Sequence, residues 1–184
     1  FRNSFPTERD KINAWVEDET NNTALRVYGG DMRGNLWRFD HDDNIAPSGR
    51  EALLLAQART GDATPAEQPI TVRPMLTMLK SGLVDVPVVS FSTGRYLNQA
   101  DITDTTRQSV YVVKDPLDTT SLGVLRTNPG MVQQTIDTTT NFVTSPQPVD
   151  YATKAGWFAD FRTSGARVNV DMQQQYYTLT VATN

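Results

Sequence analysis

Short apolar runs bounded by turn-forming residues dominate the pattern of hydrophobic and polar positions along this chain. The clearest case is residues 25–40, where an apolar segment at 25–28 and an alternating segment at 35–40 flank a glycine-rich segment at 29–34. This pattern predicts two antiparallel strands joined by a tight turn. Trp37 and Phe39 share one face of the second strand. We expect that face to be buried, because each aromatic side chain buries about 150–250 Å² when covered.

The same pattern recurs to the end of the chain and predicts an all-β fold. Residues 53–58 are ambiguous: local propensity and a capping box of Ser48 and Glu51 favour a helix, whereas a short apolar run is equally compatible with a buried strand. Pro74 indicates an edge or a bulge within the strand predicted around it. The further strands are expected at 69–79, 86–92, 108–114, 124–125, 132–136, 156–161, 167–170 and 176–182.

About ten short strands with frequent turn signals and almost no credible helix predict an antiparallel sandwich, barrel or propeller. Segments 27–31, 89–94 and 180–184 each end an apolar strand on small or polar residues, and this weak repeat favours a propeller. Their spacings of about 60 and 90 residues are uneven and exceed the 40–50 residues of a usual blade. Insertions between the strands would have to explain this excess.

Composition excludes several classes of function. The net charge is −4 and no stretch is strongly basic, which argues against nucleic-acid binding. No apolar run approaches the roughly 20 residues of a transmembrane helix. The absence of cysteine excludes disulfides and thiolate chemistry within this chain. The chain begins at Phe1 rather than Met, so we expect it to be a piece of something longer.

One loop suggests calcium. Asp40, Asp42 and Asn44 occupy positions 1, 3 and 5 of an EF-hand-like loop, and Glu51 falls at position 12. Position 6 is Ile45, where that loop needs glycine for its sharp turn. The alternative interpretation is a solvated acidic turn after a strand. We therefore assign no catalytic, cofactor-binding or metal-binding residue, and calcium is the one cofactor that this loop suggests.

Other candidate sites favour structural interpretations. The glycines of 29–34 have a phosphate-loop-like spacing, but Asn35 and Leu36 stand where Lys and Ser or Thr are needed. His41 is the only histidine, and nothing places it in a catalytic triad. Several aromatic residues could form an adhesive surface, although we favour the core for Trp37 and Trp157. These aromatic residues are Trp15, Trp37, Trp157, Tyr176 and Tyr177.

Six segments in order carry a resemblance to a known family. Tyr28-Gly-Gly-Asp-Met-Arg-Gly-Asn-Leu-Trp-Arg-Phe-Asp40 resembles the signature of the type IV pilus-associated PilY1/PilC family. One departure is Gly165-Ala-Arg167, where family members commonly have Gly-Glu-Arg; the missing carboxylate weakens any salt-bridge role for Arg167. The remaining landmarks are Gln68-Pro-Ile-Thr71, Phe91-Ser-Thr-Gly-Arg-Tyr-Leu97, Gln108-Ser-Val-Tyr111, Lys154-Ala-Gly-Trp-Phe-Ala-Asp160 and Val181-Ala-Thr-Asn184.

The resemblance implies a fragment of a C-terminal β-propeller, in which residues 1–184 form one all-β region with about three blades at approximately 13–60, 68–116 and 117–184. A strand rather than a helix at 53–58 is implied too. The resemblance also implies a pilus biogenesis and adhesion factor that is extracellular, associated with the pilus or outer membrane, and partnered by minor pilins. We expect such a protein not to be an enzyme, and to present loops 40–52, 95–108 and 126–150 to a host-cell or surface ligand. The alternatives are an enzymatic propeller, quinoprotein-like or glycan-acting, and an autonomous β-sandwich that closes its own core.

Overall fold

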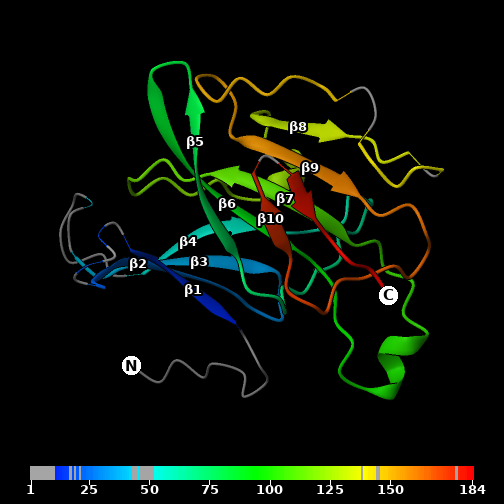
Figure 1. The fold of residues 1–184 in the computed structure, drawn as a ribbon. Coiled ribbons are helices and arrows are strands. Elements are labelled where there is room, and N and C mark those ends of the chain that lie inside the picture. The colour runs from blue at the N-terminus through cyan, green and yellow to red at the C-terminus, as the bar shows by residue number, and fades with distance from the viewer. Residues whose placement is uncertain are drawn as a thin grey trace.

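The computed structural model describes residues 11–16, 18, 20, 22–42, 45, 52–137, 139–143, 146–176 and 178–184. Within these residues the chain forms three β-sheets and two short 3-10 turns, η1 (Gln99–Ile102) and η2 (Leu125–Thr127) (Figure 1). No α-helix occurs in the described part of the chain. The prediction of an all-β fold is therefore confirmed.

The first sheet is antiparallel and has the strand order β1-β2-β3-β4. Its strand β4 confirms the strand interpretation of residues 53–58. Tertiary pairing overrides helix propensity there, because the backbone of β4 is hydrogen-bonded along both edges. Strand β3 pairs with one edge. On the other edge the Leu122 N–H donates to the Leu55 carbonyl, and the Gln57 N–H donates to the Gly123 carbonyl. Ser48 and Glu51, the capping residues of the helical alternative, lie outside the described residues. The strands are β1 (Ile12–Val16), β2 (Ala24–Gly30), β3 (Asn35–Asp40) and β4 (Ala52–Gln57).

The hairpin at residues 25–40 is confirmed, but its predicted buried face is wrong. Strand β3 buries Leu36, Arg38 and Asp40, while Trp37 and Phe39 on the opposite face are only half-buried. The polar residues can be buried because a partner from a distant segment meets one of them: Arg38 forms an ion pair with Asp115. The alternation therefore located the strand correctly, but residue type alone did not show which face the core would cover.

The second sheet has the order β5-β6-β7-β9-β8. All its pairings are antiparallel except β8 with β9, which is parallel and corrects the purely antiparallel prediction. The long connection between β8 and β9, from 135 to 155, allows this, because a parallel neighbour requires more chain than a tight turn supplies. Its strands are β5 (Met75–Ser81), β6 (Val84–Ser92), β7 (Ser109–Lys114), β8 (Met131–Gln134) and β9 (Gly156–Asp160).

Several of the predicted strands are shorter than expected or absent. The strand expected at 69–79 begins only at Met75, after Pro74, because proline cannot donate to a strand ladder. Residues 124–125 form a bridge and the start of η2 instead of a strand. Residues 167–170 have no strand assignment, although the N–H and C=O groups of Arg167 bond to the backbone of Asn184 at 3.3 and 3.0 Å.

The C-terminal residues form a small third sheet of β10 (Gln173–Gln175) and β11 (Thr178–Thr180). This hairpin lies over one face of the second sheet, where Leu179 packs against Val112, Val110 and neighbouring core residues (Figure 1). The long buried strand predicted at 176–182 is wrong. Tyr176 has a φ of 54° and is 87% exposed at the turn, and Tyr177 lies outside the described residues.

The main core lies between the first and second sheets. Tyr28, Leu36 and Leu55 of the first sheet pack with Phe91 and Tyr111 of the second. The rings of Phe91 and Tyr111 stack with their centroids 5.2 Å apart. Burial of each such side chain contributes about 1.5–3 kcal/mol. The two sheets are therefore held face to face by a continuous apolar layer.

The blade boundaries predicted for a propeller do not all coincide with sheet boundaries. Strands β7 and β8 lie on either side of the boundary placed at 116/117, yet both belong to the second sheet. The sheets described are open, so closure into a propeller and the division into three blades stay predictions.

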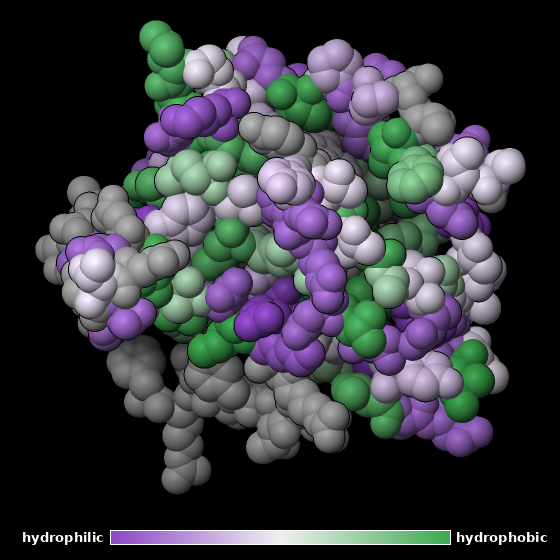
Figure 2. Space-filling model, viewed as in Figure 1, coloured by the Kyte–Doolittle hydropathy of each residue, from purple (hydrophilic) through white to green (hydrophobic). Residues whose placement is uncertain are grey.

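The face seen in Figure 2 carries hydrophobic residues interspersed among polar ones. The tip of the β5–β6 hairpin is an apolar exception, because Leu83 is fully exposed and Val84 is 64% exposed. None of the helical segments in the described residues is long and apolar enough to cross a bilayer.

Candidate functional site

Asp31 organises the turn of the opening hairpin. Its Oδ1 accepts hydrogen bonds from the backbone N–H groups of Arg33 and Asn35 at 2.8 and 2.9 Å. Its Oδ2 accepts one from the Trp37 indole N–H at 3.1 Å. Trp37, expected in the core, is thus a half-buried side chain that braces the turn. A strand follows the glycines, as the structural interpretation of this segment expects. The turn itself is shorter than predicted: it comprises residues 31–34 with Gly34 at a φ of 71°, whereas Gly29 and Gly30 belong to β2.

Gly30 has a separate role in the same motif. A Cβ added there would lie 2.2 Å from the Cγ2 atom of Ile70. The glycine therefore lets residue 70 approach the strand directly, and the N–H of Ile70 donates to the Asp31 carbonyl at 3.0 Å. Two of the segments that resemble family landmarks, 28–40 and 68–71, meet at this point.

A buried ion pair links the first sheet to the second. Arg38 Nη1 lies 2.5 Å from Asp115 Oδ1, and the two side chains are 3% and 0% exposed. The Tyr28 hydroxyl donates to Asp115 Oδ2 at 2.6 Å, and Arg38 Nη2 donates to the Asp118 carbonyl at 2.5 Å. Burial, followed by the charge of Asp115, raises the pKa of Tyr28 above its usual range, so the phenol remains a donor.

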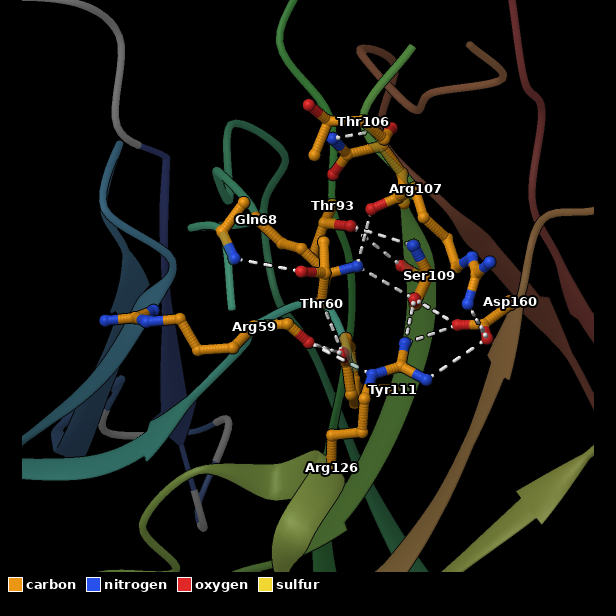
Figure 3. A network of polar contacts seen from close by, with 12 residues as sticks. Arg59, Thr60, Gln68, Thr93, Thr106, Arg107, Ser109, Tyr111, Arg126 and Asp160 are labelled. Atoms are coloured by element: carbon orange, nitrogen blue, oxygen red, sulfur yellow. Dashed lines mark hydrogen bonds and ion pairs between the residues drawn. The ribbon is translucent and has the colours of Figure 1, made fainter. Parts of the chain in front are cut away.

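A second ion pair lies nearer the surface, between Arg126 of η2 and Asp160 at the end of β9 (Figure 3). The Arg126 guanidinium donates to both carboxylate oxygens, at 2.5 and 3.1 Å, and Ser109 donates to Oδ1 at 2.7 Å. Burial opposes ionisation of Asp160. The hydrogen bonds from Arg126 and Ser109 outweigh it, so the pKa of Asp160 lies below its usual value.

Gln68 extends this network towards the chain before β7. Its Nε2 donates to the Arg107 carbonyl at 2.8 Å and to Ser109 Oγ at 3.0 Å. Its Oε1 accepts the Tyr111 hydroxyl at 2.5 Å. The network therefore fixes the backbone at Arg107 and the carboxylate of Asp160 from the interior (Figure 3).

Three surface hollows meet at Phe161, directly after β9. The largest, about 560 Å³, has Trp157 and Phe161 in its walls, together with Leu179 of β11 and Phe142 of the 136–143 segment. Two smaller hollows, of about 400 and 290 Å³, are both bordered by Phe161, Arg107 and Arg162. Trp157, expected in the core, is half-buried here. These hollows form the candidate binding surface.

Two of the three loops predicted to present a ligand-binding surface contribute to these hollows. Residues 135–137 and 141–143 come from loop 126–150, and residues 105–107 come from loop 95–108. Described residues of loop 40–52 line none of the three. The tertiary structure thus brings together two loops that are separated by the whole of β7.

The loop suggested for calcium is only partly described, because Asp43, Asn44 and Glu51 lie outside the described residues. Asp40 is 6% exposed, and its Oδ2 accepts the Ile45 N–H at 3.1 Å. Burial, and then a hydrogen bond with Asp42, raise the pKa of Asp40. The described residues contain no group of three or more His, Asp or Glu side chains able to hold a metal. Calcium binding stays a prediction.

Arg167, beside the departure from the Gly-Glu-Arg pattern, is buried without a carboxylate among its hydrogen-bond acceptors. Its Nε donates to the Gly165 carbonyl at 2.9 Å, and its Nη1 donates to the Arg95 carbonyl at 3.2 Å. It also donates to the carbonyls of Asp101 and Asp104. The residue therefore pins the 95–104 loop through backbone oxygens, a role that does not need the glutamate.

Sequence reasoning missed Asp115, Arg126 and Asp160 as organising residues, because each meets its partner across a long stretch of chain. One signal could have found part of the network. Gln68, Ser109, Tyr111 and Asp160 all lie within segments that resemble family landmarks, and the structure brings these segments together. Landmarks dispersed along the sequence thus mark one polar network.

Taken together, the molecule is a β-sheet platform with one buried and one half-buried ion pair and a hollowed surface at one end of β7 and β9. No family model matches the chain. The chain has the fold of the C-terminal domain of Pseudomonas aeruginosa PilY1, whose crystal structure it matches with a TM-score of 0.67 and 23% identity. The match covers 94% of this chain and 43% of that one.

The curated relatives are two proteins named type IV pilus biogenesis factor PilY1, from Pseudomonas aeruginosa strains PAO1 and PAK. Each is 27% identical over 190 aligned residues, which cover 82% of this chain and 16% of the relative. The chain therefore corresponds to a small part of these proteins. The sequence resemblance to the PilY1/PilC family is confirmed, as a resemblance to the C-terminal region of PilY1.

Proposed function

We propose that the chain is a non-enzymatic structural and binding module of a type IV pilus biogenesis factor that acts at the cell surface. The observation that carries the proposal is the 27% identity over 82% of the chain to proteins named as such factors. The module would stand on the pilus or outer membrane, contact minor pilins and present its loops to a host-cell or surface ligand. Adhesion and the closed propeller form part of the same proposal.

The interior supports a rigid platform rather than a mobile catalytic centre. The carboxylates of Asp115, which is buried, and of Asp160, which is half-buried, both accept hydrogen bonds from an arginine and from a further donor. Asp137, the carboxylate bordering the large hollow, accepts the N–H groups of Thr139 and Thr140 at 2.9 and 2.8 Å. These carboxylates are committed to holding the backbone in place, which favours a binding surface presented by fixed loops.

The pilus role is tested in the source organism by deleting this segment from the full-length protein. We expect fewer surface pili, measured in sheared fractions, while the amount of the shortened protein in the cell envelope stays normal. A matched strain with Lys80→Ala in the intact protein should keep its pili, because Lys80 is an exposed residue whose ion-pair partner is also exposed. Normal piliation in the deletion strain would overturn the proposal.

Calcium binding by loop 40–51 is tested by thermal unfolding. A ligand that binds only the folded state raises Tm with its concentration. We propose that the loop is an acidic turn, and expect the same Tm in EDTA and in millimolar calcium. A rise with calcium that Asp42→Asn abolishes would restore the metal site.

A further inference from the structure

Two exposed arginines flank Phe161 on the candidate binding surface. Arg107 and Arg162 both border the hollow of about 400 Å³ and the hollow of about 290 Å³. Arg107 lies just before β7, and Arg162 lies two residues after the end of β9. The adjacent strands therefore deliver two guanidinium groups to the same pair of hollows.

The donors of both arginines are largely uncommitted. Arg107 Nη1 is 4.0 Å from Asp160 Oδ2, and Arg162 Nη1 is 3.5 Å from the Ile136 carbonyl oxygen. Both distances exceed those of normal N–H···O hydrogen bonds. Asp160 is already satisfied by Arg126 and Ser109 at 2.5 and 2.7 Å. Each guanidinium keeps its fork of donors for an outside acceptor, and carboxylates fit that fork in a bidentate manner.

The local charge also favours an anion, although the whole chain carries −4. Two carboxylates border the two hollows, Asp62 and Asp160. Arg126 pairs closely with Asp160, which Arg107 also faces at 4.0 Å, and Asp137, near Arg162, borders only the larger neighbouring hollow. Among the residues that line the two hollows, Asp62 is therefore the one carboxylate with no arginine paired to it, against the two guanidinium groups. A hollow with an excess of one sign concentrates ligands of the opposite sign.

The remaining walls distinguish a sugar from a bare anion. Phe161 is half-buried between the hollows and offers an apolar surface. Hydroxyl and amide side chains surround it, and these can exchange hydrogen bonds with the hydroxyl groups of a sugar ring. They are Thr105, Thr106, Thr163, Ser164, Gln133 and Gln134.

From this arrangement we propose that the two hollows bind a carboxylate-bearing sugar, such as a uronic or sialic acid unit of a surface polysaccharide. Arg107 and Arg162 bind its carboxylate, and Phe161 packs against its ring. The proposal deepens the proposed binding function by naming the ligand class, and it rests on that function for its biological setting.

The buried network of Figure 3 holds this site in place. Gln68 fixes the Arg107 carbonyl at 2.8 Å, and the Phe161 N–H donates to the Gln108 carbonyl at 3.0 Å. Asp160, the residue before Phe161, is held by Arg126. The backbones that carry the two arginines are therefore fixed before a ligand arrives, which lowers the entropic cost of binding.

The test is calorimetric titration of the protein with a galacturonic acid tetramer and with sialyllactose. The neutral controls are the fully methyl-esterified tetramer and lactose, which keep the rings and remove the carboxylates. We expect at least one acidic sugar to bind, at least tenfold weaker binding by Arg107→Gln and Arg162→Gln, and weaker binding as salt rises. Lys80→Ala, remote from the hollows, should bind like the wild type.

Three results would overturn the proposal: no binding of either acidic sugar, equal binding of the neutral controls, or equal binding of a glutamate tetrapeptide. An unchanged Tm in both arginine variants shows that lost binding is not unfolding, and Arg162→Lys should retain part of the affinity if charge is the cause. Counting surface pili in the arginine variants separates the two proposals. Normal pili together with lost sugar binding would show that the arginines serve ligand binding and not pilus formation. Absent pili together with intact sugar binding would have a cause outside this site.

Discussion

Two arginine–carboxylate pairs have the same chemistry but lie at different depths in the molecule. Arg38 and Asp115 lie between the sheets, with side chains 3% and 0% exposed. Arg126 and Asp160 lie beneath the surface hollows, with side chains 10% and 18% exposed. The first pair joins β3 to the end of β7, and the second joins η2 to the end of β9.

The difference in burial indicates that the two ion pairs have different roles. Loss of one partner in a fully buried pair leaves a charge that no water can reach, which costs far more than the intact pair contributes. A pair at the wall of a hollow can recover part of its hydration when it is broken. We therefore interpret Arg38–Asp115 as a determinant of folding, and Arg126–Asp160 as a support for the binding surface.

The largest effect is expected from Asp115→Asn. It leaves the buried guanidinium of Arg38 without a counter-ion and weakens the acceptor of the Tyr28 hydroxyl. Breaking such a pair costs about 3–5 kcal/mol, which denaturant unfolding would measure. The double variant Arg38→Met with Asp115→Leu should lose less unfolding free energy than the sum of the losses in the single variants Arg38→Met and Asp115→Leu. Strict additivity would contradict the coupling between the two residues.

Asp160→Asn should have a smaller effect, about 1–3 kcal/mol, because it weakens charge-assisted hydrogen bonds from Arg126 and Ser109 near solvent. The same unfolding measurement gives a direct comparison with Asp115→Asn. A loss as large as that of Asp115→Asn would erase the distinction between the two pairs.

The pH dependence sharpens the role of Asp160. Its folded pKa is lowered, so it contributes stability that is present above the unfolded value of about 3.9 and is lost as pH falls through the folded value. The wild type should therefore lose stability below about pH 4 more steeply than Asp160→Asn, measured by Tm across acidic buffers. Parallel curves for the two proteins would show that Asp160 does not contribute in this way.

The smallest effect is expected at the surface pair Lys80–Asp85, which is 2.8 Å apart with side chains 80% and 54% exposed. Solvent screening leaves little net energy in such pairs. Lys80→Ala should leave Tm unchanged at physiological salt. A clear fall in Tm would mean that distance rather than burial decides which ion pairs stabilise this molecule.

The glycine-rich hairpin shows how far sequence reasoning reached. Its turn and both strands could be predicted, because alternation and turn residues act locally. Its buried face could not, because the burial of Arg38 depends on Asp115, which lies far along the chain. The aromatic residues were misleading for a different reason. The Trp37 indole N–H finds its acceptor, Asp31, within the neighbouring turn, so this side chain is satisfied outside the core.

Residues 53–58 show the opposite case. Local propensity favoured a helix, and only the family resemblance pointed to the strand that the structure contains. The parallel pairing of β8 with β9 had no local signal at all. Hydrogen bonding across a sheet joins residues far apart in sequence, so pairing partners cannot be read from either segment alone.

The sequence by itself determined the all-β character, the position of most strands and the resemblance to PilY1, because alternation, turn residues and ordered landmarks are all local features. Only the tertiary structure decided which charged residues are buried and which hollows form. Those outcomes depend on contacts such as Arg126–Asp160 and on the meeting of residues 105–107 with 161–165. A charged side chain is buried only where folding brings its partner within reach.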